Sequence, residues 1–157
     1  MKIVTMVVAA LAMGAPAATL SGDKALVISA QDIQTQTAAA IPQVKPVGLG
    51  GPTLANYGNL ASLSISIRTA NGVGEVHQHA DDLMIVQQGT ATLITGGTLV
   101  DPKPTTPGEV RGTSVQGGVS RTLNVGDVVI VPVGVPHQIL IPPGTVYSSL
   151  LAKIKEP

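Results

Sequence analysis

The sequence predicts an all-β fold, an antiparallel jelly-roll barrel of roughly nine or ten short strands behind one short N-terminal helix. Eighteen glycines and twelve prolines in 157 residues indicate many turns, which suit short strands better than long helices. From Leu60 onward the apolar residues recur with a period of two, as in half-buried strands. Two Tyr, no Phe and no Trp leave Val, Ile, Leu and Ala to build the core.

The length favours a single domain, which we expect to follow an export signal. Residues 1–17 are predicted to be a signal peptide in which Lys2 carries the positive charge. Ile3 to Met13 is an uncharged apolar run, and Ala15-Pro16-Ala17 offers small residues for cleavage. The run is too short to span a bilayer comfortably, so we expect a periplasmic or secreted protein with no membrane contact after cleavage. A buried first strand or helix is the alternative interpretation.

Residues 18–42 are predicted to form an N-terminal strand and a short helix. Ala25 to Ser29 is a short apolar run that suits an outer strand. The helix is expected from Ser29 to Ile41, because Ser29 and Asp32 have the spacing of an N-terminal capping pair and Pro42 would end it.

Residues 43–157 are predicted to be the barrel domain. Pro46 to Gly58 is rich in Gly and Pro and is expected to be irregular. Beyond it, Leu63, Ile65 and Ile67 alternate with serines and Arg68, which predicts a half-buried strand. The other expected strands are Val76–His79, Leu83–Gln88, Thr90–Thr95, Val119–Asn124, Val128–Val131, Gln138–Ile141 and Thr145–Ile154.

A long polar segment from Asp101 to Gly118 carries three prolines and several glycines and is expected to be a loop. Loops of this length inside a compact domain are usually functional or mobile. The segment could cover the mouth of a site or be a solvated insertion, and the two interpretations have equal weight.

Composition excludes several classes of function. Charged residues make up 11% of the chain and the formal net charge is zero, so no basic surface is expected for nucleic acid. The chain has no cysteine, which excludes disulfides, thiol catalysis, thiolate ligands and a lipobox anchor.

The three histidines of the chain all lie in one bipartite pattern. His77 and His79 are separated by one residue, so on a continuous strand both side chains point to the same face. His137 follows a separate strand that is bounded by Gly and Pro. If the two strands lie opposite each other, three imidazoles converge. Burying them together without a shared ion would be costly, so the pattern indicates a metal site.

The two segments resemble the paired motifs of the cupin superfamily, over about residues 43 to 155. The second motif is matched in full by Gly126, Pro132, Gly134 and His137. The first is matched by its two histidines and the closing Gly89. The resemblance implies a double-stranded β-helix, which is the jelly-roll barrel already predicted.

The carboxylate of the first motif departs from the cupin pattern. The residue seven positions before Gly89, where cupins carry Glu, is Asp82, which is only three positions beyond His79. If the carboxylate is instead counted from His79, the longest usual spacing between the second histidine and the carboxylate falls on Met84. Methionine cannot be a hard ligand. Asp82 is therefore the expected fourth ligand.

Other side chains are possible neighbours of the metal. Glu75 shares strand parity with His77 and His79 and could be a ligand or could orient an imidazole. A rim position facing water is the interpretation that we favour for Glu75. Tyr57 and Tyr147 are further candidates for orienting a substrate, although structural roles are the simpler expectation for both.

The resemblance implies one divalent metal ion, which could be Fe, Mn, Zn or Ni, held by His77, His79, Asp82 and His137. Such an open centre suits an enzyme of the dioxygenase, isomerase or lyase type that acts on a small molecule. A non-catalytic ligand-binding or sensor cupin, with a structural or ligand-anchoring metal, is the alternative. An inward-pointing titratable group that is not a ligand would favour the enzyme. Cupins often pair through exposed sheet surfaces, so a homodimer is also possible.

Overall fold

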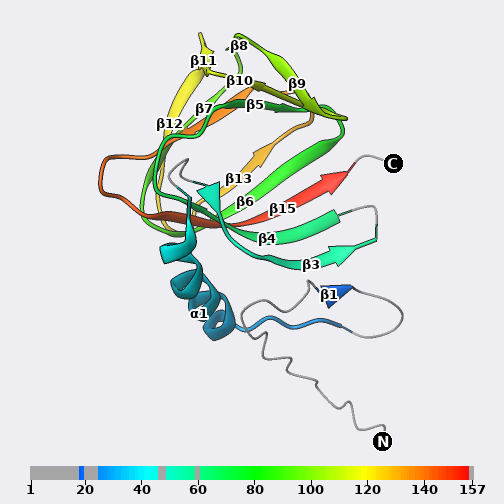
Figure 1. Ribbon diagram of the computed structural model, residues 1–157, viewed down its shortest axis with the longest axis vertical. Helices are drawn as coiled ribbons and strands as arrows, with labels where there is room; N and C mark the ends of the chain where they lie inside the picture. The colour runs from blue at the N-terminus through cyan, green and yellow to red at the C-terminus, as the bar shows by residue number, and fades with distance from the viewer. Residues whose placement is uncertain (1–17, 20–24, 46–48, 59–60, 156–157) are drawn as a thin grey trace, which may run out of the picture.

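A computed structural model describes residues 18–19, 25–45, 49–58 and 61–155 of the chain. Two antiparallel sheets face each other to form a barrel, and one helix lies against the outside of the larger sheet (Figure 1). The expected all-β jelly-roll barrel with a short N-terminal helix is therefore confirmed. The predicted signal peptide, residues 1–17, lies outside the described residues. Within the described residues, no helix is both long and apolar enough to cross a membrane.

The larger sheet has seven strands in the order β1-β3-β4-β15-β6-β13, with β2 paired to β4. Most of its strand pairs are antiparallel, and β1 pairs with β3 in parallel. The strands are β1 (Ala18–Thr19), β2 (Leu49–Gly50), β3 (Thr53–Tyr57), β4 (Ala61–Arg68), β6 (Ala80–Gln88), β13 (Val128–Val131) and β15 (Tyr147–Lys155).

The second sheet has six strands in the order β12-β7-β14-β5-β10-β9, and β8 and β11 form a separate pair. Its strands are β5 (Gly74–His77), β7 (Ala91–Thr95), β9 (Lys103–Thr106), β10 (Glu109–Gly112), β12 (Val119–Leu123) and β14 (His137–Leu140). The small pair consists of β8 (Thr98–Val100) and β11 (Ser114–Gln116).

Helix α1 (Ala30–Ala40) begins as the sequence predicts and continues into a short 3-10 turn (Ile41–Gln43). The Asp32 backbone N–H donates to the Ser29 hydroxyl, and the Ser29 backbone N–H donates to the Asp32 carboxylate. This reciprocal pair satisfies amide groups that the first turn of a helix leaves without partners.

Strand β4 separates two packing layers. Its apolar face, Ile65 and Ile67, packs outward against Ile33 and Ile41 of the helical segment. Its other face, which carries the serines and Arg68, points into the barrel, where Ser64 donates to the Leu151 carbonyl. The expected half-buried strand is present, but the polar face is the one that faces the barrel interior.

Another part of the barrel interior is filled by apolar side chains from both sheets. The cluster consists of Met84, Val86, Ala91, Leu93, Leu123, Val131, Ile139, Ile141 and Tyr147. This apolar cluster closes one part of the interior and leaves the part around β5 and the C-terminal end of β15 to polar groups.

Three expectations about local structure are wrong. Residues 25–29 lie in the described part of the chain and form no strand there. Residues 46–58 were expected to be irregular but contain β2 and β3. The expected loop at 101–118 holds β9, β10 and β11, with β9 and β10 joined by a tight turn at Pro107-Gly108.

Candidate metal centre

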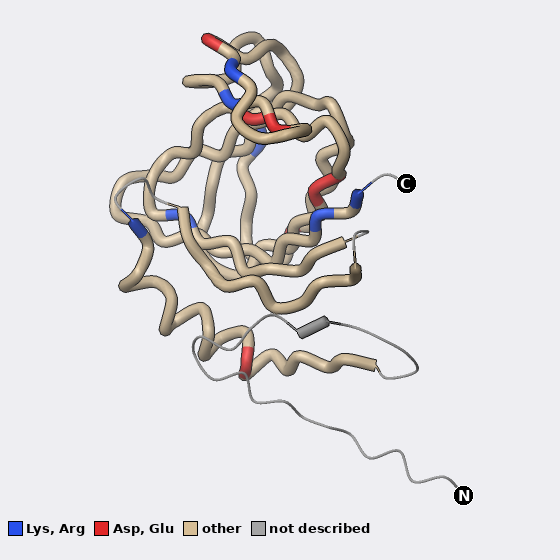
Figure 2. The backbone as a smooth tube through the Cα atoms, turned by 45° about the vertical axis from the view of Figure 1, so that its right-hand side comes forward, with Lys and Arg blue, Asp and Glu red and all other residues tan. Residues whose placement is uncertain are grey.

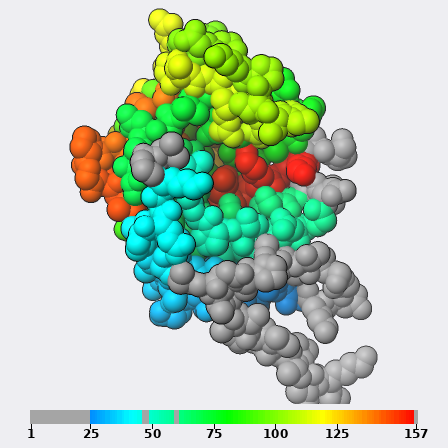
Figure 3. Space-filling view, in the orientation of Figure 1, coloured from blue at the N-terminus to red at the C-terminus, as the bar shows by residue number. Residues whose placement is uncertain are grey.

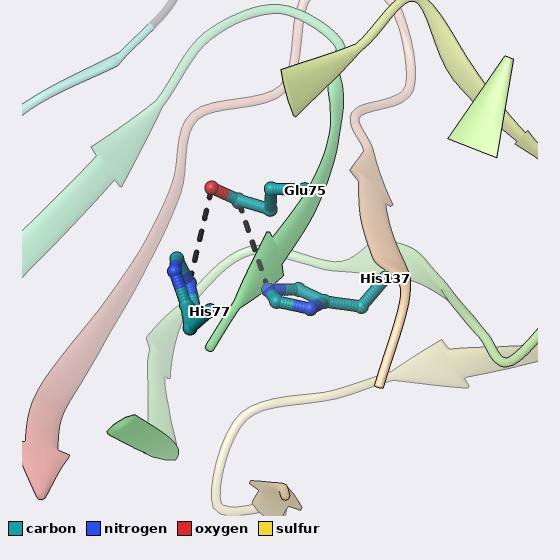
Figure 4. Close-up of side chains that lie close together, drawn as sticks. All are labelled: Glu75, His77 and His137. Atoms are coloured by element: carbon teal, nitrogen blue, oxygen red, sulfur yellow. Dashed lines mark ion pairs between the residues drawn. The ribbon is translucent and has the colours of Figure 1, made fainter. Parts of the chain in front are cut away.

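Strands β5 and β14 bring a carboxylate and two imidazoles together inside the barrel. His137 is the direct antiparallel partner of Glu75, and His77 follows two positions later on the same face of β5. The exposed fraction is 6% for Glu75, 4% for His77 and 1% for His137, so all three residues are buried. One ligand atom from each lies within 4.8 Å of the other two, and the side chains point toward one another (Figure 4). The rim position favoured for Glu75 is therefore wrong.

Asp82 approaches the same point from β6, in the facing sheet. Its Oδ2 lies 3.2 Å from His77 Nε2 and 3.7 Å from His137 Nε2. The Glu75 oxygens lie 4.0 Å from His77 Nε2 and 3.8 Å from His137 Nε2. Two ligands bound at about 2.1 Å to one ion are at most about 4.2 Å apart. All four imidazole–carboxylate separations meet that limit, with Glu75 facing the two imidazoles through different oxygens, so these contacts are compatible with ligands of one divalent ion.

Three cationic side chains surround these acids. Arg68 Nη2 donates to Glu75 Oε1 at 3.1 Å, and Arg111 Nη1 contacts the other Glu75 oxygen. Lys153 Nζ donates to Asp82 Oδ1 at 2.9 Å and to His77 Nε2 at 2.8 Å. The ammonium group therefore lies beside two of the ligand atoms. Charged residues are few along the chain, as the mostly tan tube of Figure 2 shows, which makes this gathering of charges notable.

Both imidazoles are held so that Nε2 faces the centre. His77 Nδ1 lies 2.8 Å from Glu109 Oε2, and Arg111 Nη2 donates to the same oxygen at 2.9 Å. His137 Nδ1 donates to the Val135 carbonyl at 3.1 Å. An N–H at Nδ1 leaves Nε2 with a lone pair, which is the tautomer that a metal ligand requires, and in His77 this lone pair accepts from Lys153.

Burial and neighbouring groups together set the pKa values in the site. Burial lowers the pKa of His137 to about 4, so this imidazole is neutral at neutral pH. Burial raises the pKa of Asp82, but its close contacts with His77 and Lys153 outweigh it and bring the pKa below its usual value. Burial also lowers the pKa of Arg68 and of Arg111. An ionised Asp82 and a neutral His137 are the forms that bind metal.

The other predicted site residues lie elsewhere. β5 ends at His77 and the chain bends at residues 78–79, so His79 leaves the face of His77. His79 is exposed, and its ring lies close against Gly108, in the turn between β9 and β10. Tyr57 is exposed on β3. Tyr147 is fully buried in the apolar cluster. The structure therefore joins His77, Asp82, His137 and Glu75 and leaves His79 outside.

Comparison with known proteins gives agreement at the level of fold. No family model matches the chain, and no curated protein matches its sequence. Among solved structures, the Cnp3 cupin domain of Schizosaccharomyces pombe aligns with a TM-score of 0.52 at 12% identity, covering 69% of this chain and 61% of that one. A protein with a double-stranded β-helix domain from Klebsiella pneumoniae aligns with a TM-score of 0.51 at 14% identity, covering 71% of this chain and 75% of that one. This chain has the cupin fold. A recombinant oxalate oxidase in complex with glycolate aligns with a TM-score of 0.50 at 14% identity. The alignment spans 71% of this chain and 53% of the oxidase.

The cupin motif also accounts for the position of Asp82. Counted from His77, the longest usual cupin spacing ends on Asp82, which lies seven positions before Gly89. In this register Glu75 stands where the motif that the chain resembles has its first histidine, and His77 stands where it has the second. Gly89 has a φ of +73°, and a Cβ there would lie 2.3 Å from the Val146 carbonyl, so glycine is required at this turn.

The metal-free protein is expected to lose stability as the pH falls from about 6.5 to about 4. The unfolded chain binds a proton at His137 near pH 6.5, whereas the folded protein binds it only near pH 4. Stability is therefore full above this window and falls by up to about 3 kcal/mol across it. Asp82 contributes only at lower pH, because its pKa lies below its usual 3.8. Urea unfolding at a series of pH values measures the slope, and His137→Gln should flatten it. An equal slope in that variant would contradict the assignment.

Proposed function

We propose that this cupin is a metal-dependent enzyme that acts on a small molecule through one divalent ion held by Glu75, His77, Asp82 and His137. One observation carries the proposal: all four separations between imidazole and carboxylate atoms, 3.2 to 4.0 Å, suit ligands of one ion. The groups are buried and come from both sheets, so the fold itself sets their spacing.

The donor set favours iron or manganese. Two imidazoles with one carboxylate form the ligand set of non-haem iron oxygenases, and a second carboxylate makes the set harder. When bound, such an ion supplies Lewis-acid or redox chemistry at its open positions. We therefore propose a dioxygenase with iron, and an isomerase or lyase if the ion is manganese.

Charged groups that are not ligands favour the enzyme over a passive binding protein. Lys153 Nζ lies within hydrogen-bond distance of both His77 and Asp82, where it can give a proton to a substrate oxygen beside the ion. Arg111 and Glu109 form a chain of contacts behind His77 that fixes the orientation of its ring. General acid chemistry needs a proton donor in such a position.

A second candidate function follows from the position of Lys153. Its ammonium group already bridges His77 and Asp82, and it could serve as the permanent cation of a barrel that binds a small ligand without metal. This is a non-catalytic small-ligand-binding or sensor cupin.

Metal titration separates the two functions. The protein is stripped with chelator and titrated with Fe²⁺ without oxygen, and separately with Mn²⁺ and Zn²⁺. We expect one equivalent bound per chain, with a rise in unfolding temperature, because the ion binds only the folded site. Iron-loaded protein is then tested for oxygen consumption with small phenols, diketones and carboxylates. If none of the three ions binds, the metal centre is wrong and the ligand-binding barrel takes its place.

We also propose that the enzyme acts outside the cytoplasm, in the periplasm or after secretion. The support is in the sequence alone: Lys2, the uncharged run from Ile3 to Met13 and the small residues at 15–17. Expression of the full chain followed by N-terminal sequencing of the exported product tests this.

A further inference from the structure

The barrel interior beside the metal ligands is polar and cationic. On β15, Lys153 is the direct partner of Ser62 and of Asp82, and direct partners share a face of the sheet. The serines of β4 and Arg68 therefore line the same wall as Lys153. Ser149, on this face of β15, is fully buried, and its hydroxyl has no hydrogen-bond partner among the described residues.

The charges in this region balance without a metal. Three carboxylates, from Glu75, Asp82 and Glu109, alternate in space with three cations, from Arg68, Arg111 and Lys153. A divalent ion bound to Glu75 and Asp82, with neutral imidazoles, adds two positive charges to a partly buried group of zero net charge. A buried excess of charge is costly unless a counter-charge enters with it.

Metal binding also changes the partners of Lys153. His77 Nε2 has one lone pair, so it cannot accept from the ammonium group and bind an ion together. Lys153 then loses one of its two partners while it remains on β15 beside the centre. Its side chain is 31% exposed and that of Arg111 is 33% exposed, against 10% for Arg68. Lys153 and Arg111 are the cations that a ligand from solvent can reach.

We propose that the substrate is a small carboxylate anion, held at the centre by Arg111 and Lys153. This inference rests on the proposed metal centre. A carboxylate can bind a guanidinium through two parallel hydrogen bonds and pair with the ammonium as a point charge. Figure 3 shows β15, coloured red, at the surface between β3 and β4 on one side and the strands of the second sheet on the other. A carboxylate in solvent can reach Lys153 and Arg111, because both side chains are partly exposed.

Cobalt-loaded protein and malonate test the proposal, with malonamide as the uncharged counterpart. Binding is followed by the visible spectrum of Co²⁺ and by calorimetry. We expect wild type to bind malonate and not malonamide. Lys153→Met and Arg111→Gln should each raise the Kd for malonate at least tenfold. Lys45→Met and Arg121→Gln, which change exposed residues away from the centre, should leave it unchanged. Lys153→Arg should restore most of the affinity.

The metal affinity of each variant is measured in the same experiment. Lys153→Met should bind Co²⁺ at least as tightly as wild type, because it removes the competing ammonium group. If Co²⁺ binds but malonate binds equally in all variants or not at all, the carboxylate inference is overturned and the metal centre stands. If wild type binds no Co²⁺, the proposed function is overturned, and the inference that rests on it is overturned with it.

Discussion

Replacing His77 with alanine is expected to lower the affinity for divalent metal by ~100-fold or more, whereas His79→Ala leaves it unchanged. His77 Nε2 lies 3.2 Å from Asp82 Oδ2 inside the barrel, and His79 is exposed against Gly108. Loss of a residue that merely orients a ligand costs about 10- to 100-fold in affinity, so loss of a ligand should reach the upper end of that range or exceed it. Metal content after dialysis and competition with a coloured chelator measure the effect.

The two variants are matched, since each removes one imidazole from the same short segment. Wild type at a metal concentration 100 times its Kd should gain about 2.7 kcal/mol of stability. His79→Ala should gain the same amount, and His77→Ala, with an affinity ~100-fold weaker, at most about 0.4 kcal/mol. If His79→Ala loses metal as strongly as His77→Ala, then the centre has three histidines, and the ring of His79 must leave Gly108 and enter the barrel on metal binding.

The sequence named three of the four residues that the structure brings together, His77, Asp82 and His137, but it added His79 by a rule that did not apply. Side chains two positions apart share a face only while the strand continues, and β5 ends at His77. The usable signal was the fixed distance between the motif's carboxylate and its closing Gly89, which selects Asp82. The longest usual spacing between the second histidine and that carboxylate then selects His77 rather than His79. Glu75 then follows two positions earlier.

Lys153, Arg111 and Glu109 were missed because long-range pairing brings them to the site. Glu109 and Arg111 lie in the segment expected to be a loop, and they reach the centre only because β10 pairs with β5. A local signal existed, since Pro107-Gly108 between short segments with Thr and Val is typical of a hairpin. Lys153 is placed by the pairing of β15 with both β4 and β6, which nothing in the local sequence indicates.

Strand β4 shows a limit of periodicity itself. Alternation predicts a half-buried strand with two different faces, but it does not say which face points into the barrel. Here helix α1 covers the isoleucine face from outside the barrel, so the serines face inward. Which face points to the site depends on what else the chain places against the strand, and that is a property of the tertiary structure.

Replacing Tyr147 with alanine is expected to destabilise the protein by about 3–5 kcal/mol, the cost of removing a large aromatic side chain from a packed core. Tyr147 is fully buried in the apolar cluster between the two sheets, and burial raises the pKa of its hydroxyl. Its phenol group was a candidate for orienting a substrate, but its position predicts a packing role. The free energy of unfolding in urea, measured on metal-free protein, gives the size of the loss.

Tyr147→Phe is the matched control, because it keeps the ring and removes only the hydroxyl. The hydroxyl has no hydrogen-bond partner among the described residues, so its removal should be neutral or should stabilise the fold by about 1 kcal/mol. Metal and malonate affinities should be unchanged in the same variant, since the packing role requires only the ring. A phenylalanine variant that folds as well as wild type but loses malonate binding would instead show that the hydroxyl reaches the ligand, and the assignment of Tyr147 to the core alone would be wrong.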